Sequence, residues 1–360
     1  MSAPLSGIRV VACVSGAAAG YALRMLSILG AEALLVEPDG GSPLRWQPPF
    51  LPGSKISALF AWLTAGTQIQ TGGLDAALAS ADIFLHDTPL ADREGLGLDE
   101  ATIATRFPDL IHVSVLPFGA SGPKASWKGE DINILHASGE GYLLPNGLSV
   151  EMFPDRPPVK PYGHFCDYQG GTAAALGALT ALWASDTSGG QYVDISSQDA
   201  ALAVGAFAIQ RLGDGSVEHR VERSFRYGGV IACADGYVEL LTLEQRQWDG
   251  LVDLLGNPDW AQDPALASNI ERSRRGPEIN AHIRSWAQSR RVEDIVREGQ
   301  KRSVPIAKYC TVDEVLCDPH EAHRGLFQPI SFGEAGVLPA LASPFHFSGA
   351  PLKLRERVTT

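Results

Sequence analysis

The chain has 360 residues, 45% of them hydrophobic and 19% charged, and its formal net charge is −12. This length exceeds what a single hydrophobic core usually supports, so we expect two domains. The negative charge and the lack of a Lys/Arg run argue against nucleic acid as a partner. No apolar run is long enough to span a bilayer, and the first residues lack a signal-peptide pattern. We therefore expect a cytoplasmic protein without membrane contact.

The cysteines are scattered and odd in number, and none of them forms a C-x-x-C pair. They are Cys13, Cys166, Cys233, Cys310 and Cys317. This pattern is typical of a protein from a reducing compartment, and it predicts neither a disulfide framework nor a zinc site.

The first part of the chain alternates apolar runs with helical patterns. We expect strands at 8–14, 31–38, 81–87 and 109–115 and helices at 21–30 and 98–107. Short, continuously apolar runs are typical of parallel strands that are buried on both faces. The alternation therefore predicts an α/β fold with a doubly wound parallel sheet.

The turn after the first expected strand reads Ser-Gly-Ala-Ala-Ala-Gly at 15–20. It lacks the G-x-G-x-x-G spacing with which a dinucleotide-binding turn approaches pyrophosphate. Glu37 ends the second strand, where a ribose-binding acid would stand, but without the glycines the sequence disfavours NAD(P).

Asp167 stands between an extended run at 157–165 and a helix of small residues at 170–183. A carboxylate at the start of a buried helix is costly to desolvate unless it is paired or used. Taken alone, Asp167 is most simply explained as an N-cap, because Asp is among the residues preferred there. Only the surrounding sequence favours catalysis.

The second half of the chain predicts a smaller α+β domain. After a strand that runs into a helix at 191–202, a polar linker is expected at 213–227. A hairpin turn at Ala-Asp-Gly 234–236 and amphipathic helices follow, and the Gly- and Pro-rich tail at 329–351 is expected to return to the first domain. The predicted boundaries are 1–211 plus 328–360 for the large domain and 212–327 for the small one.

Several segments, in order along the chain, resemble the family III CoA-transferases, the CaiB/BaiF group. They lie at 4–45, 109–123, 129–139, around Asp167, at 189–202, 234–243, 247–256 and 318–327. The group includes formyl-CoA and carnitine CoA-transferases and α-methylacyl-CoA racemases. The resemblance implies a large doubly wound domain with an inserted small domain. It also implies an interlocked homodimer, with each active site between one subunit's large domain and the other's small domain.

The resemblance further implies that Asp167 is the catalytic nucleophile. In such transferases the carboxylate attacks an acyl-CoA thioester, and CoA then passes through an aspartyl-CoA thioester to a small carboxylic acid, without a metal. A carboxylate is ionised at neutral pH, so the attack needs no general base. We expect Gly170 and Gly171, at the start of the helix, to donate N–H groups to the oxyanion.

Racemisation of a 2-methylacyl-CoA is the main alternative. The racemases carry His in a G-H-D-I-N motif, where this chain has Glu130. Two-base proton exchange needs groups whose pKa lies near the operating pH, so Glu130 would need a raised pKa. His136 and His164 lie nearby but off the motif, and His164 either orients substrate or is structural. Glu244 stands one residue from the racemases' small-domain acid and is at best a substrate-side residue. Because Glu130 replaces the motif His, transferase is favoured over racemase.

Recognition of CoA is expected to depend on a few cations. The resemblance suggests Arg24, Arg45, Lys124, Lys128, Arg93 and Arg106, with Lys128 as the best candidate for a phosphate contact. Family members usually carry an N-x-G-K-R-S segment where this chain has a shortened region at 56–80. That loss is compatible with a weakened CoA site, or with a non-catalytic subunit that pairs with a related chain.

Overall fold

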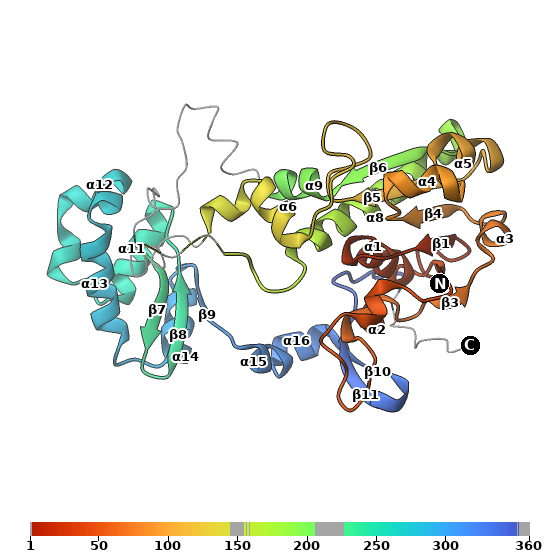
Figure 1. The fold of residues 1–360 in the computed structure, drawn as a ribbon. Helices are drawn as coiled ribbons and strands as arrows, with labels where there is room; N and C mark the ends of the chain where they lie inside the picture. Colours follow the sequence, from red (N-terminus) through yellow and green to blue (C-terminus); the bar gives the residue numbers. More distant parts are fainter. Residues whose placement is uncertain are drawn as a thin grey trace. The chain divides into compact units, whose positions relative to one another are not determined.

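The structure is a computed structural model, and it describes residues 2–144, 155, 157, 159–205, 227–350 and 352. The chain divides into two compact units, shown in Figure 1. The first unit comprises Met1–Gly141, Lys160–Phe207 and Pro319–Thr360, and the second comprises Tyr142–Val159 and Ala208–Asp318. Most of the segment at 142–159, which the predicted boundaries place in the large domain, lies outside the described residues. Most of the expected linker at 213–227 lies outside the described residues.

The first unit contains a six-stranded parallel sheet in the order β3-β2-β1-β4-β5-β6. The strands are β1 Arg9–Cys13, β2 Glu32–Glu37, β3 Gln68–Thr71, β4 Ile83–His86, β5 Ile111–Leu116 and β6 Tyr192–Ser196. The predicted α/β class is confirmed, and so are the four strands expected before residue 116. β3 was not expected, because it has four residues and mostly exposed side chains. The strand order reverses between β1 and β4, where open α/β sheets bind ligands at the carboxyl ends of the strands.

Helices cover both faces of this sheet. The face that carries Val10 packs against α1 (Ala17–Ile28) and α8 (Phe165–Ser188). The face that carries Val11 and Phe84 packs against the helices that follow β3 and β4. These are α3 Leu74–Leu78 and α5 Glu100–Arg106, and α4 Leu90–Leu96 precedes α5 in the chain. Alternate residues of one strand are thus buried on opposite faces, which explains the continuous apolar runs.

α8 begins earlier than the small-residue pattern predicts. Its N-cap is His164 and Asp167 lies in its first turn, so Asp167 is not the N-cap. β6 runs directly into α9 (Ser197–Val204), as expected.

The residues from Pro319 onward belong to the first unit, whereas the predicted boundary placed 319–327 in the small domain. They contain α16 Pro319–Arg324 and the antiparallel hairpin of β10 Phe327–Ser331 and β11 Val337–Leu341 (Figure 1). Ile330 and Ala340 of this hairpin are buried in one cluster with Ala61 of α2 (Ala58–Leu63). The hairpin therefore packs against α2 and the residues beside it, up to Ala65. Among its described residues the unit also contains α6 Asp131–Ala137 and the 3-10 turns η1 Pro43–Trp46 and η6 Gly333–Ala335, and η2 Glu140–Leu143 begins in it.

The second unit is α+β, as predicted. An antiparallel sheet of β7 Gly229–Cys233, β8 Gly236–Leu240 and β9 Ile306–Lys308 includes the expected hairpin at 234–236. Its helices are α11 Gln245–Leu254, α12 Asn269–Arg274, α13 Gly276–Ala287, α14 Val292–Lys301 and α15 Val312–Leu316, with 3-10 turns η4 Asp259–Gln262 and η5 Pro264–Ala267. Ile231, Val238 and Ile306 bury one face of the sheet in the core with Trp248 and Ile283. Within the described ranges of both units, no helix is long and apolar enough to cross a membrane.

Candidate active site

The first turn of α8 brings Asp167 and His164 together. His164 Nδ1 lies 2.9 Å from Asp167 Oδ2, and their side chains are 32% and 18% exposed. The hydrogen bond to the carboxylate raises the pKa of His164 above its usual range, although partial burial opposes this shift. Among the described residues, Oδ1 of Asp167 has no hydrogen-bond partner. One carboxylate oxygen is thus held while the other is available.

The buried side chain of Asp131 anchors this turn. Asp131 Oδ1 accepts hydrogen bonds from Cys166 N at 2.7 Å and from Asp167 N at 3.1 Å. Its Oδ2 pairs with Lys160 Nζ at 2.9 Å. Two of the first-turn N–H groups, which have no partner within a helix, are satisfied in this way. Sequence reasoning missed both Asp131 and Lys160. The available signals were an acid inside the Gly-Glu-Asp-Ile-Asn segment and a lysine shortly before Asp167.

An aromatic cluster holds the start of α8 against the rest of the first unit. The rings of Tyr168 and Tyr21 stack at 4.6 Å, and Trp62 of α2 lies 5.9 Å from each. Burial, and then the neighbouring Tyr21, raise the pKa of Tyr168 to about 12. Tyr168 therefore stays neutral and acts as a packing residue beside Asp167.

Gly170 and Gly171 pack closely against neighbouring elements. A Cβ on Gly170 would lie 2.2 Å from Ser197 Oγ, and one on Gly171 would lie 2.4 Å from the carbonyl oxygen of Ala18. Both residues lie beyond the first turn of α8, where N–H groups normally bond to carbonyls of the same helix. The oxyanion role of these two glycines stays a prediction, and their place in the helix weighs against it.

Between the carboxyl ends of β1 and β4, the carboxylate of Asp87 occupies backbone N–H groups at the start of α1. Asp87, directly after β4, accepts hydrogen bonds from Ser15 N at 2.9 Å and from Gly16 N at 2.6 Å. Burial raises the pKa of Asp87 to about 6, although these hydrogen bonds oppose the shift. A dinucleotide phosphate would need the same N–H groups at the start of α1. Glu37 is also engaged, by Arg45 and Ser42 N. Both observations weigh against a dinucleotide site.

Comparison with known proteins identifies the family. Residues 5–358 match the family model described as CoA-transferase family III. The chain belongs to this family. The resemblance noted from the sequence motifs is therefore confirmed.

Relatives with assigned names include other CoA-transferases. The probable CoA-transferase Rv1866 of Mycobacterium tuberculosis is 30% identical over 82% of this chain, which spans only 38% of that relative's length. The succinate–glutarate CoA-transferase of Agrobacterium fabrum is 27% identical, with 97% of this chain and 91% of the relative covered. A CaiB/BaiF family protein from Brucella suis has the same fold, with a TM-score of 0.84 and 26% identity. That match covers 100% of this chain and 97% of the other.

The two glutamates predicted near the site are helix caps, and the second histidine is exposed. Glu130 is the exposed N-cap of α6, and its N–H donates to Asn133 Oδ1 at 2.9 Å. Glu244 is the N-cap of α11 in the second unit and pairs with Arg246 at 2.6 Å. His136 is exposed at the end of α6. Acid–base or substrate roles for Glu130 and Glu244 stay predictions.

Two of the arginines expected to contact CoA are buried. Arg24 is 1% exposed and donates to the carbonyl oxygens of Ala65 and Leu341, and burial lowers its pKa to about 10. Arg93 donates to Thr88 O, Tyr192 Oη and Ser114 Oγ. These bonds tie separate segments of the first unit together and weigh against phosphate contacts.

The other four cations lie nearer the surface. Arg106 forms an ion pair with Asp75 at 2.8 Å. Arg45 donates hydrogen bonds to Glu37 through two nitrogens, and its guanidinium lies over the ring of Phe60. Lys124 and Lys128 follow β5: Lys124 Nζ lies 3.4 Å from Gln198 Oε1, and Lys128 is exposed. Lys128 forms no ion pair or hydrogen bond within the part of the chain that the structure describes. It is therefore the most available cation of the six.

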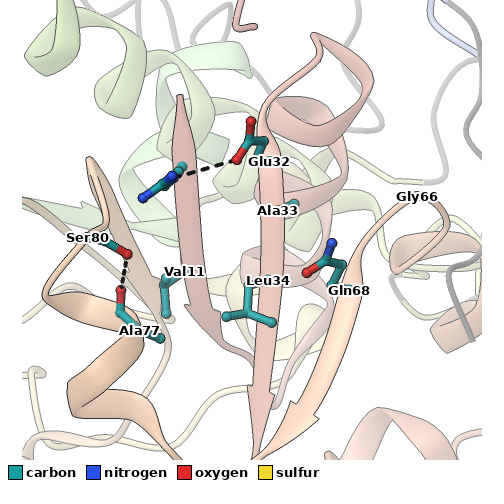
Figure 2. Close-up of a pocket in the computed structure, with 9 residues that line it drawn as sticks. Val11, Glu32, Ala33, Leu34, Gly66, Gln68, Ala77 and Ser80 are labelled. Atoms are coloured by element: carbon teal, nitrogen blue, oxygen red, sulfur yellow. Dashed lines mark hydrogen bonds and ion pairs between the residues drawn. The ribbon is translucent and has the colours of Figure 1, made fainter. Parts of the chain in front are cut away.

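A pocket of about 400 Å³ lies elsewhere on the sheet (Figure 2). Arg9, Glu32 and Gln68, the first residues of β1, β2 and β3, line it together with Leu34. Ligands of open α/β sheets bind at the opposite, carboxyl ends of the strands. None of the predicted site residues lines this pocket. Within the described residues, no group of three or more His, Cys, Asp or Glu side chains is placed to hold a metal.

Proposed function

We propose that this family III member transfers CoA from an acyl-CoA to a small carboxylic acid, with Asp167 as the nucleophile. The observation that carries the proposal is the first turn of α8, where His164 holds Oδ2 of Asp167 and Oδ1 lacks a partner among the described residues. The family match and the position of Asp167 within the quoted motifs support the same assignment.

The transfer is written as four substitutions at carbonyl carbons. Oδ1 of Asp167 attacks the thioester carbon, the C–S bond breaks, and CoA thiolate leaves an acyl-aspartyl anhydride. The thiolate then attacks the aspartyl carbonyl and releases the donor acid as its carboxylate, which leaves aspartyl-CoA. The acceptor carboxylate attacks this thioester and expels CoA thiolate. The thiolate finally attacks the acceptor carbonyl and releases the Asp167 carboxylate with the new acyl-CoA. No proton is gained or lost over the cycle, so no general base is required.

The surroundings of Asp167 suit this chemistry. The positive end of the α8 dipole favours a carboxylate in the first turn. An imidazolium at His164 stabilises that carboxylate when it leaves from a mixed anhydride. Asp131 holds the backbone N–H of Asp167, so the nucleophile starts from a fixed position.

Binding of CoA by an acidic chain requires local cations. We assign this role first to Lys128 and then to Lys124, because both lie in the loop after β5 at the carboxyl edge of the sheet. An interlocked homodimer, or a heteromer with a related subunit, is proposed from the family resemblance. The racemase alternative lacks support, because its second base would be Glu130, which caps α6.

The test is covalent labelling of Asp167. The protein is incubated with succinyl-CoA or acetyl-CoA, and peptide mass spectrometry locates a CoA adduct that hydroxylamine removes. We expect the adduct on Asp167, and we expect Asp167→Asn to abolish both the adduct and CoA exchange. The matched control is Asp186→Asn, an exposed aspartate of the same helix, which keeps full activity. Exchange at the wild-type rate by Asp167→Asn would refute the mechanism. CoA binding without turnover by any donor, rescued only by a second family chain, would indicate a non-catalytic subunit.

A further inference from the structure

We propose that Lys160 is a positioning residue, which fixes the turn before α8 and thereby places Asp167 for attack; this rests on the proposed function. The ammonium group of Lys160 donates to Asp131 Oδ2 at 2.9 Å, to Pro161 O at 3.0 Å and to Gly163 O. An ammonium group has three N–H donors, so all of them are engaged. The last acceptor belongs to the residue directly before His164.

The hydrogen bonds continue from Lys160 to the nucleophile. Asp131 uses Oδ2 for Lys160 and Oδ1 for the N–H groups of Cys166 and Asp167. Lys160 therefore bonds directly to the turn before His164, and it restrains the backbone of Asp167 indirectly, through the carboxylate of Asp131. Both halves of the His164–Asp167 pair depend on the same cation.

The turn itself has little intrinsic rigidity. Gly163 has a φ of 89°, a left-handed conformation that glycine adopts without steric cost and also leaves easily. Lys160 is the first residue of the chain after the segment Tyr142–Val159, which groups with the second unit. The ammonium group of Lys160, which bonds to the carbonyl oxygens of Pro161 and Gly163, restrains this turn.

Stability alone is a poor explanation for this ion pair. The side chains of Asp131 and Lys160 are only 8% and 26% exposed, and partly buried pairs lose much of their Coulombic gain to desolvation. The geometry of the pair is better explained by its bonds to the turn before His164 and to the backbone of Asp167.

The test uses Lys160→Met and measures kcat, the KM for acyl-CoA and the pKa of His164. The pKa is followed by NMR of protein labelled with ¹³C at histidine Cε1, with His164→Asn for assignment. We expect kcat to fall about 10- to 100-fold while KM changes less than about twofold, because misplacing a reacting group affects the chemical step. Lys160→Arg, which keeps the charge and several donors, restores much of kcat. Lys308→Met, which removes a lysine paired with Glu314 in the second unit, leaves both kcat and the His164 pKa unchanged.

The His164 titration separates positioning from a simple charge effect. The charges that act on His164 are Asp167 and Asp131, which raise its pKa, and Lys160, which lowers it. If Lys160 acted only through its charge, its removal would raise the pKa of His164 further. If it positions the pair, Lys160→Met breaks the bond to Asp167, and the pKa falls toward 6.5.

A rise or no change in the His164 pKa, or an unchanged kcat, would overturn the proposal. Lys160→Gln, which removes the charge and is one bond too short to reach the same three acceptors, gives the same comparison if Lys160→Met does not fold. Failure of the proposed function is seen separately, as full exchange by Asp167→Asn or no turnover by the wild type. The histidine titration still tests the positioning in that case.

Discussion

The contact between α1 and α8 at Gly171 holds the helix that carries Asp167, the proposed nucleophile, so Gly171→Ala is the most informative packing change. A Cβ at this position would lie 2.4 Å from Ala18 O, 2.9 Å from Tyr21 Cβ and 3.2 Å from Ala22 N. Ordinary contact begins at 3.4 Å, so the two helices must separate by about 1 Å (3.4 − 2.4). Two of the three neighbours are backbone atoms, which cannot move by a change of rotamer.

The expected cost follows from two opposing effects. Overpacking of this degree costs about 3 kcal/mol, and alanine gains about 1 kcal/mol over glycine inside a helix. The net loss of unfolding free energy is therefore about 2 kcal/mol, measured from urea denaturation. Asp167 lies one turn before Gly171 in the same helix, and a shift of about 1 Å in a reacting group lowers kcat about 100-fold.

Gly95→Ala in α4 is the matched control, because a Cβ there meets nothing within 4 Å. It should stabilise the protein by about 0.5–1 kcal/mol and leave kcat unchanged. A Gly171→Ala protein as stable and as active as the wild type would refute the reasoning, since the helices would then tolerate separation without moving the site.

Three further outcomes are expected. His164 has a raised pKa through its bond to Asp167, so the stability that it contributes is complete below 6.5 and disappears as pH rises through the higher folded-state pKa. Urea denaturation of wild type and His164→Asn should therefore differ most at acidic pH, and a difference that grows with pH would contradict the ion pair. Arg93→Met should cost about 2–4 kcal/mol, because buried partners lose a charged donor, yet leave the KM for acyl-CoA unchanged. A raised KM for acyl-CoA together with unchanged stability would instead indicate that Arg93 contacts CoA. Lys128→Ala should raise that KM about fivefold, the effect of about 1 kcal/mol, without lowering the thermal midpoint, and an unchanged KM would remove Lys128 from the site.

Local patterns in the sequence predicted most of the sheet but failed where a segment depends on distant partners. Continuous apolar runs marked β1, β2, β4 and β5, because burial on both faces leaves a signal in the strand itself. β3 has mostly exposed side chains and carries no such signal. The start of α8 was misplaced because its first-turn N–H groups are satisfied by Asp131, which lies 35 and 36 residues away in the chain.

The candidate site divides in the same way. Asp167 was identified from motif context, and the structure adds that its carboxylate lies in a helix turn beside His164. Lys160 and Asp131 were not predicted near the site, because neither lies in a local pattern that reveals the contact between them. The proposed role of each residue depends on its contact with the other.

The sequence by itself determined the family and the parallel sheet and singled out Asp167 as the proposed nucleophile, because motif order and apolar runs are local properties of the chain. Only the tertiary structure decided which charges are engaged. Arg24 is buried and donates hydrogen bonds to carbonyl groups 41 and 317 residues away, whereas Lys128 is exposed. Burial and pairing depend on contacts between segments that are distant in sequence, and the desolvation that decides a charge's role arises only when those segments pack together.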